Sequence, residues 1–174
     1  PTLSSAASDV YKRQGLFVPK SIKPFRKEEL IKLSSLKYNE LAVEIIFPFI
    51  GNFMTKKELS SLISKSYSHF RCEDVVKISD LGKFKILELF HGPTLAFKDI
   101  AMQLIGNFYQ YHLESVEKKI NIIVATSGDT GAAAIDALKG KTNLNVFVLH
   151  PHNKISPVQR RLMTCLLYKS DAAD

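Results

Sequence analysis

Residues 120–138 read INIIVATSGDTGAAAIDAL, and this stretch decides the fold class. Its first part, residues 120–125, is a compact apolar run of the kind found in a strand that is buried on both faces. Residues 131–138 are rich in alanine and have helical spacing, and such small side chains let a helix approach a sheet closely. A short polar loop that contains glycine, residues 126–131, joins the two. A buried strand, a short loop and a helix together indicate a parallel α/β unit.

The segments on either side continue this alternation. Residues 99–115 are predicted to form a helix, and residues 144–149 form a second compact apolar run, which predicts another buried strand. Residues 156–164 begin a further helix, with Pro157 suited to its first turn. Helix and strand therefore alternate over residues 98–163, which predicts a parallel sheet with right-handed crossovers. Ligands of such sheets bind beyond the carboxyl ends of the strands.

The N-terminal half is predicted to be helical, with one β-hairpin. Apolar residues at helical spacing indicate three helices, at residues 25–36, 39–50 and 55–67. Thr55 and Glu58 have the spacing of a capping box at the start of the third helix. Two strand-like runs, residues 75–79 and 84–90, flank a turn at residues 80–83 and predict the hairpin. The predicted fold class is α/β: a helical region with a β-hairpin, then the start of a parallel α/β sheet.

The two ends of the chain do not resemble parts of this fold. Residues 9–14 (DVYKRQ) and 165–174 (CLLYKSDAAD) resemble translations of the two ends of a transposon sequence used in sequencing adapters. We therefore predict that residues 1–14 and 165–174 are non-native tails, with an ordinary tail as the alternative. The rest is divided into a helical and hairpin region, residues 15–91, and an incomplete α/β core, residues 92–164.

The composition is that of an ordinary globular protein, with 45% hydrophobic and 24% charged residues. The net charge of +7 comes from scattered basic residues without interleaved aromatic residues, so we expect no nucleic-acid face. No apolar run reaches the length of a membrane span. The cysteines, Cys72 and Cys165, form neither a disulfide framework nor a zinc motif. His150 and His152 lack a third ligand, so we expect no metal site.

A single lysine, Lys98, follows a turn signal and an apolar run in residues 91–99, HGPTLAFKD. It stands at the start of a predicted helix, where desolvation and the helix dipole both favour a neutral amine. A neutral amine is what Schiff-base chemistry requires. A solvated, inert lysine is the alternative that the local sequence leaves open. The neighbouring His91 is more typical of a hydrogen-bonded structural residue than of a catalytic base.

The Ser-Gly-Asp-Thr-Gly turn, residues 127–131, opens the alanine-rich helix. Its backbone N–H groups, its hydroxyls and the helix dipole suit an anion such as a phosphate or a carboxylate. It lacks the Gly-Lys-Ser/Thr of a P-loop and the Gly-x-Gly-x-x-Gly of a dinucleotide site. One alternative is that this segment is an ordinary turn without a function. Another is that the protein is a non-catalytic phosphate-binding module, which would need only this loop.

Four ordered segments resemble the threonine synthase family of pyridoxal phosphate enzymes, which have the tryptophan-synthase-β fold, fold type II. They are residues 15–19, 88–99, 125–133 and 154–157. The resemblance implies that Lys98 binds the cofactor covalently and then moves protons. It implies that Asp129 lies near the ring hydroxyl of the cofactor and that Thr94 shapes the substrate pocket. The residues implied to hold the substrate carboxylate are Ser127, Gly128, Asp129, Thr130 and Gly131.

The reaction implied by the resemblance converts O-phospho-L-homoserine and water to L-threonine and phosphate, in a cytoplasmic lyase of threonine biosynthesis. A threonine-synthase-like phospho-lyase, or another fold-type II lyase acting on serine or threonine, is the alternative within the class. Members of the family continue beyond this sequence, and their later loop that holds the cofactor phosphate is absent from it. We therefore predict half a site and little or no activity for this chain alone.

Overall fold

The computed structural model describes residue 19 and residues 21–165. The chain divides into two compact units, Pro1–Ser61 and Leu62–Asp174. The predicted N-terminal tail, the C-terminal tail beyond Cys165 and almost all of the extended run at residues 15–19 lie outside the described residues. Those predictions, and the predicted division of the chain at residue 92, stay predictions.

The first unit is helical, as predicted. Helix α2 spans Lys27–Leu33, helix α3 spans Tyr38–Ile50, and helix α4 spans Lys56–Tyr67 and continues into the second unit. The capping box at the start of α4 is confirmed, because the N–H of Thr55 donates to Glu58 Oε2 at 2.7 Å. The N–H of Glu58 donates in return to Thr55 Oγ1 at 3.2 Å. These two bonds satisfy amide groups that a helix start leaves without partners.

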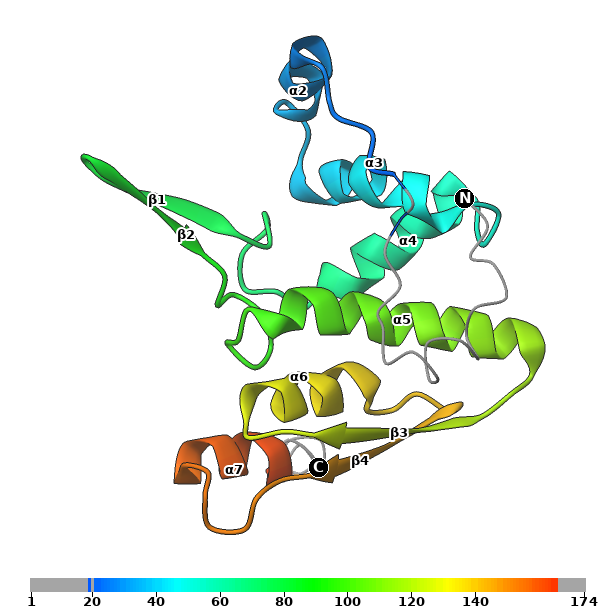
Figure 1. Ribbon diagram of the computed structural model, residues 1–174, viewed down its shortest axis with the longest axis vertical. Helices are drawn as coiled ribbons and strands as arrows, with labels where there is room; N and C mark the ends of the chain where they lie inside the picture. The colour runs from blue at the N-terminus through cyan, green and yellow to red at the C-terminus, as the bar shows by residue number, and fades with distance from the viewer. Residues whose placement is uncertain (1–18, 20, 166–174) are drawn as a thin grey trace. The chain divides into compact units, whose positions relative to one another are not determined.

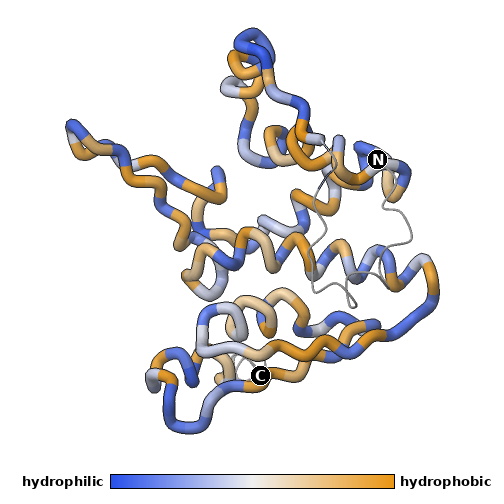
Figure 2. The backbone as a smooth tube through the Cα atoms, in the orientation of Figure 1, coloured by the Kyte–Doolittle hydropathy of each residue, from blue (hydrophilic) through white to orange (hydrophobic). Residues whose placement is uncertain are grey.

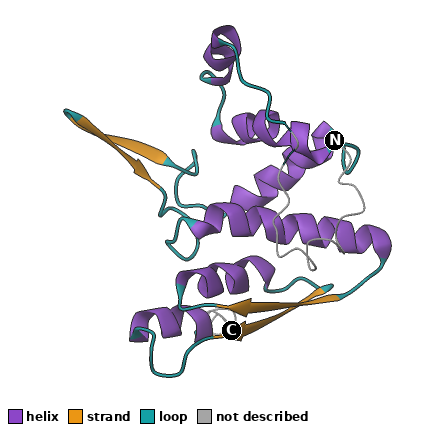
Figure 3. Ribbon diagram, in the orientation of Figure 1, coloured by secondary structure: helices purple, strands orange, loops and turns teal. Residues whose placement is uncertain are grey.

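The second unit begins its sheet structure with the predicted hairpin, seen as two strands in Figure 3. Strands β1, Lys77–Leu81, and β2, Phe84–Glu88, pair antiparallel. The first strand was predicted two residues too early, at residues 75–79. Val75 has a φ of +63° and only 1% exposure, so it is a buried turn residue in a conformation that breaks an extended strand.

The remaining elements alternate as the sequence predicted. They are α5, Lys98–Val116; β3, Ile120–Ala125; α6, Asp129–Leu138; β4, Leu144–Leu149; and α7, Pro157–Thr164. Strands β3 and β4 are parallel neighbours, paired from Ile120↔Leu144 to Ala125↔Leu149. Figure 1 shows α5 and α6 running in the opposite direction to both strands, with α6 lying between α5 and the sheet. The α/β fold class is confirmed.

The sheet is buried on one face, and the prediction that β3 is buried on both faces was wrong for the described part of the chain. Leu113, Leu138 and Leu144 form a core cluster, against which Ile120, Ile122 and Val146 pack. The alternate side chains of the two strands face the other way, and Ile123, Phe147 and Leu149 are 69%, 54% and 61% exposed. Figure 2 shows that both strands are apolar over most of their length. Side chains alternate between the faces of a strand, and the helices cover only one of them.

Helices α5 and α6 approach each other closely because small residues meet at their contact. A Cβ atom added at Gly106 of α5 would lie 2.7 Å from the carbonyl oxygen of Ala137 in α6. Beside this point, Gln103 Nε2 donates to Asp136 Oδ2 at 2.6 Å. The described helices include none that is long and apolar enough to cross a membrane.

The substitution Gly106→Ala tests this close approach. Because the added methyl group meets backbone rather than a flexible side chain, α5 and α6 must separate, and we expect destabilisation by about 1–3 kcal/mol. Urea unfolding measured by circular dichroism checks this value. Ala101→Ser adds one atom at an exposed position of the same helix and should change stability by less than about 0.5 kcal/mol. Equal stability of the Gly106→Ala protein and the unmodified chain would contradict the close contact.

Candidate active site

The predicted lysine and the predicted anion loop lie at the same end of the α/β unit. Lys98 is the first residue of α5, and Asp129 is the first residue of α6. Since both helices run opposite to β3 and β4, their first turns lie where the two strands end (Figure 1). This is the edge at which parallel α/β sheets bind ligands.

The segment that precedes Lys98 is folded around a buried carboxylate. Asp99 has no exposed surface, and it accepts hydrogen bonds from the N–H of Thr94 at 2.8 Å and from Thr94 Oγ1 at 2.6 Å. Gly92 leaves room for this arrangement, because a Cβ there would lie 2.4 Å from Asp99 Cβ. Leu95 turns the chain with a φ of +64°. The position of Lys98 is therefore set by its neighbour in the sequence.

Two opposing effects act on Asp99. Burial raises the pKa of its carboxyl group, and the hydrogen bonds from Thr94 act in the opposite direction. The negative charge of Asp136 in α6 adds to the upward shift of the pKa. Thr94 is itself 4% exposed and gives its hydroxyl to Asp99, so the residue predicted to shape the substrate pocket faces inward.

The side chain of Lys98 is half-buried, and its Nζ lies 4.4 Å from the centre of the Phe97 ring. The apolar residues expected to enclose it are themselves open to solvent, with Leu95 50% and Phe97 58% exposed. The amine is thus accessible to a small molecule at this edge.

His91 joins the hairpin to the lysine segment. Its Nε2 lies 2.9 Å from Glu88 Oε2, and its carbonyl oxygen accepts a hydrogen bond from the N–H of Arg71 at 2.8 Å. Glu88 also accepts a hydrogen bond from Ser79, which, more than the contact with His91, lowers the pKa of the Glu88 carboxyl. His91 is thus held by hydrogen bonds, and the purely structural role that the sequence favoured for it stays a prediction.

The loop between β3 and α6 is shaped by Thr126, a residue that was not singled out from the sequence. Thr126 Oγ1 accepts hydrogen bonds from the N–H groups of Gly128 at 3.1 Å and Gly131 at 3.2 Å. Gly131 is buried, and a Cβ there would lie 2.5 Å from Thr126 Cγ2 and 2.7 Å from Met163 Sδ. A hydroxyl directly after a buried strand, ahead of two glycines, was the signal that could have identified Thr126.

Thr126 therefore divides the five residues of the Ser-Gly-Asp-Thr-Gly turn into two groups. Gly128 and Gly131 direct their N–H groups inward and fix the loop. Ser127 and Asp129 are exposed, and Thr130 is half-buried, at the first turn of α6, where backbone N–H groups lack intrahelical partners. These three residues are therefore the ones in the turn whose side chains are at least partly open to solvent, and their contact with a ligand stays a prediction.

The residues of this edge fit pyridoxal phosphate. Lys98 offers an accessible primary amine for the aldehyde, and the turn offers hydroxyls, a carboxylate and backbone donors for the ring hydroxyl and a substrate carboxylate. By contrast, no three His, Cys, Asp or Glu side chains within the described ranges gather as a ligand set for a metal ion.

The parallel α/β unit has the fold of part of the type II pyridoxal phosphate enzymes, as its structural neighbours show. The pyridoxal phosphate-bound threonine synthase from Brucella melitensis superposes with a TM-score of 0.81 and 38% identity, over 88% of this chain and 33% of that one. The family model "Threonine synthase N terminus" matches residues 4–67. The chain belongs to the threonine synthase family.

Two relatives illustrate the extent of the match. Threonine synthase from Pseudomonas aeruginosa is 40% identical over 166 residues, which are 95% of this chain and 34% of that protein. Human "Threonine synthase-like 2" is 39% identical over 155 residues, 88% of this chain and 32% of that protein. The chain thus spans about a third of the length of the curated relatives it matches. The family match also begins inside the segment predicted to be a non-native N-terminal tail.

The substitution Thr94→Val tests the anchoring of the lysine segment. It removes a hydroxyl donor from a fully buried carboxylate, and we expect a loss of about 1.5–3 kcal/mol of stability. Urea unfolding measures the loss, and Thr94→Ser, which keeps the donor, is the matched control. If the valine variant were no less stable than the serine variant, the hydroxyl would not be holding Asp99.

The raised pKa of Asp99 predicts a specific pH dependence. A raised pKa means that the folded protein binds this proton more tightly than the unfolded chain does. The contribution of Asp99 to stability therefore falls as the pH rises from the ordinary value of 3.8 through the raised pKa. The difference in unfolding free energy between the unmodified protein and Asp99→Asn should shrink over this interval. Urea titrations at a series of pH values measure it, and a difference that grows with pH would refute the assignment.

Proposed function

We propose that the chain is the lysine-bearing part of a threonine synthase that converts O-phospho-L-homoserine and water to L-threonine and phosphate. The observation that carries the proposal is that the helix beginning at Lys98 and the helix that follows the Ser127–Gly131 turn start at the same end of the α/β unit (Figure 1). The family of the chain supports the same reaction, because threonine synthases align with most of its length.

Each residue has a defined part in this proposal. Lys98 Nζ would hold pyridoxal phosphate covalently. Ser127 and Thr130, with the exposed amides of the turn, would bind the substrate carboxylate, and Asp129 would face the ring hydroxyl of the cofactor. Gly128 and Gly131 would keep the turn in shape through their bonds to Thr126. Thr94 would act indirectly, by holding Asp99 and hence the start of α5.

Bound pyridoxal phosphate supplies an electron sink for the carbon next to the substrate amine. The protein residues must orient the carboxylate, keep the amine of Lys98 within reach and transfer protons. With the cofactor bound, Lys98 Nζ would be the base at this edge that could carry a proton between neighbouring carbons. Phosphate leaves from the γ-carbon, and water adds at the β-carbon, so the products balance as L-threonine and phosphate. A cytoplasmic place for this reaction remains a prediction.

The test uses a full-length protein that carries this segment, and the chain by itself for comparison. We expect borohydride reduction with pyridoxal phosphate to label the peptide that contains Lys98. Lys98→Ala should lower threonine formation by about 10²–10⁴-fold, the range for a group that transfers protons. Lys119→Ala, at an exposed lysine beyond α5, should leave both label and turnover unchanged.

Two outcomes would count against the proposal. Label on a different lysine, or none, would reject Lys98 as the cofactor lysine, and absence of label would favour a phosphate-binding module. The chain alone should show no strong visible absorbance with pyridoxal phosphate, because it spans only about a third of the length of the threonine synthases it matches. Robust turnover by the chain alone would show that the site is already complete.

A second candidate is a threonine-synthase-like phospho-lyase, favoured by the match to human "Threonine synthase-like 2". The two reactions differ in the fate of the carbon skeleton after phosphate leaves. Supplying O-phosphohomoserine and measuring L-threonine against 2-ketoacid separates them. Ketoacid without threonine would replace the first candidate by the second.

A further inference from the structure

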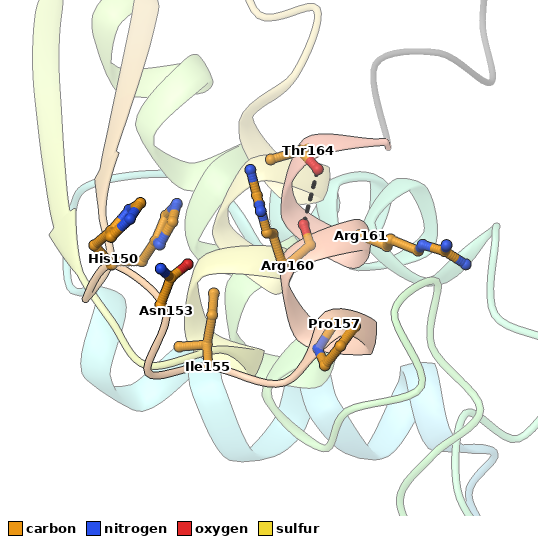
Figure 4. Close-up of a pocket in the computed structure, with 8 residues that line it drawn as sticks. His150, Asn153, Ile155, Pro157, Arg160, Arg161 and Thr164 are labelled. Carbon is orange, nitrogen blue, oxygen red and sulfur yellow. Dashed lines mark hydrogen bonds between the residues drawn. The ribbon is translucent and has the colours of Figure 1, made fainter.

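Helices α4, α5 and α6 contribute to the wall of a pocket of about 390 Å³ in the second unit. It is distinct from the pocket drawn in Figure 4, which lies between the end of β4 and α7 and includes His150, the residue directly after β4. Neither Lys98 nor any residue of the Ser127–Gly131 turn lines the pocket of α4, α5 and α6. We call it the Lys141 pocket, after a lysine that follows α6 and forms part of its wall.

The amine of Lys141 stands at the end of a chain of buried hydrogen bonds. Its Nζ donates to Asn107 Oδ1 at 2.7 Å, and Asn107 Nδ2 donates to Ser66 Oγ at 2.8 Å. Ser66 Oγ donates in turn to the carbonyl oxygen of Leu62 at 2.7 Å. Asn107 is 7% exposed and Ser66 is 2% exposed, so α4 and α5 hold the acceptor of the amine in one place. The amine therefore has a fixed position in the wall of the Lys141 pocket.

Lys141 has an amide and not a carboxylate as its partner. Within residues 19 and 21–165, no acidic side chain lies within ion-pair distance of its Nζ. Asp136, a carboxylate in the same wall, accepts hydrogen bonds from Lys139 Nζ at 2.6 Å and from Gln103 Nε2 at 2.6 Å. A neutral acceptor stabilises an ammonium group less than a carboxylate does. The charged form of Lys141 is therefore only weakly supported.

Burial and a neighbouring lysine act on this amine in the same direction. Lys141 is half-buried, and desolvation lowers the pKa of its amine. The positive charge of Lys65 on α4 lowers this pKa further, and the negative charge of Glu114 on α5 opposes the shift. His69 and Lys139 add further basic groups to the wall. A lysine that is desolvated beside another cation has a larger neutral fraction, and the neutral amine is the nucleophile.

We propose that Lys141 is a modification site, at which a small acyl phosphate that enters the Lys141 pocket acylates the amine. The Nζ attacks the carbonyl carbon, so that an N–C bond forms and the C–O bond to the phosphate group breaks. Inorganic phosphate leaves with the electron pair, and solvent takes the proton of the amine. The products are an amide and phosphate, and neither an oxidant nor a reductant takes part. The inference is independent of the proposed function.

The Lys141 pocket suits both parts of such a reagent. Lys65 supplies a positive charge and His69 an N–H donor for the phosphate group, while the amine of Lys141 supplies the nucleophile. After the transfer, the amide N–H of the modified side chain can still donate to Asn107 Oδ1, so the buried hydrogen bonds are kept. The modification removes one of two like charges and with it the repulsion between Lys141 and Lys65. Acylation is therefore compatible with the folded chain.

Acetyl phosphate is the probe, and peptide mass spectrometry measures the rate at which each lysine of the chain is acetylated. Lys141 should react several-fold faster than Lys119, an exposed lysine beyond α5. Lys65→Gln should slow the reaction of Lys141 a few-fold, because a charge that lowers its pKa and attracts phosphate is lost. Lys57→Gln removes the same charge from the same helix outside the pocket and should leave the rate unchanged. Equal rates for Lys141 and Lys119, or equal effects of the two variants, would overturn the proposal.

Asn107→Asp tests the role of the amide partner. A carboxylate at this position pairs with the ammonium group and favours the charged form, so acetylation of Lys141 should slow strongly while Lys119 reacts as before. Circular dichroism checks that the variant folds, and Lys65→Gln gives an independent test at an exposed position. An unchanged rate in the folded Asn107→Asp protein would contradict the proposed reactivity.

Acetic anhydride, which carries no phosphate group, separates the two effects of Lys65. With the anhydride only the effect on the pKa of Lys141 remains, so Lys65→Gln should slow acetylation less than it does with acetyl phosphate. The same loss with both reagents would reject an acyl phosphate as the reagent of this pocket. None of these measurements involves pyridoxal phosphate or turnover, so their failure would leave the proposed function untouched.

Discussion

The buried carboxylate of Asp99 determines how the chain presents its lysine. A carboxylate without solvent contact must have hydrogen-bond donors, and Thr94 supplies two of them from five residues earlier. These bonds close the segment between Gly92 and α5 into a compact turn, and the absence of a side chain at Gly92 makes the closure possible. Lys98, which stands next to Asp99 at the helix start, is held by its backbone while its amine stays accessible.

The loop between β3 and α6 is fixed by the same kind of interaction, in which a side-chain oxygen accepts backbone N–H groups. Here the oxygen belongs to a hydroxyl and not to a carboxylate. Thr126 Oγ1 accepts two backbone N–H groups, and Gly131 leaves space for the Thr126 methyl group and for Met163 of α7. In both loops a short side chain bonds to backbone groups, and a glycine removes the steric obstacle. The two loops are thereby ordered by interactions within the α/β unit, before any ligand binds. Ordering a site in advance reduces the entropy that binding must overcome.

The sequence predicted the elements well and the exposure of particular side chains poorly. Three features were predicted correctly because each depends on residues that are close together in the sequence. They are the helical spacing, the Thr55–Glu58 capping box and the apolar runs of β3 and β4. Val75 was misplaced because a left-handed backbone conformation at a β-branched residue has no local signature. The hydrogen bonds of Thr94 and Thr126 were not predicted, because their hydroxyls bond to groups two to five residues away, and the type of a residue does not reveal its partner. The pocket after β4 was missed because it requires α7 to fold back beside His150.

The exposed face of the sheet shows that an apolar pattern can predict a strand correctly and still mispredict how many of its faces are covered. Ile123, Phe147 and Leu149 are large apolar residues at alternate positions, opposite a face that already packs on α6. A strand that faced water on one side would carry polar residues there, as Asn121 and Asn145 do where their side chains pair at 2.9 Å. The exposed face of the sheet therefore combines this polar pair with three large apolar residues, and the described helices cover only the other face.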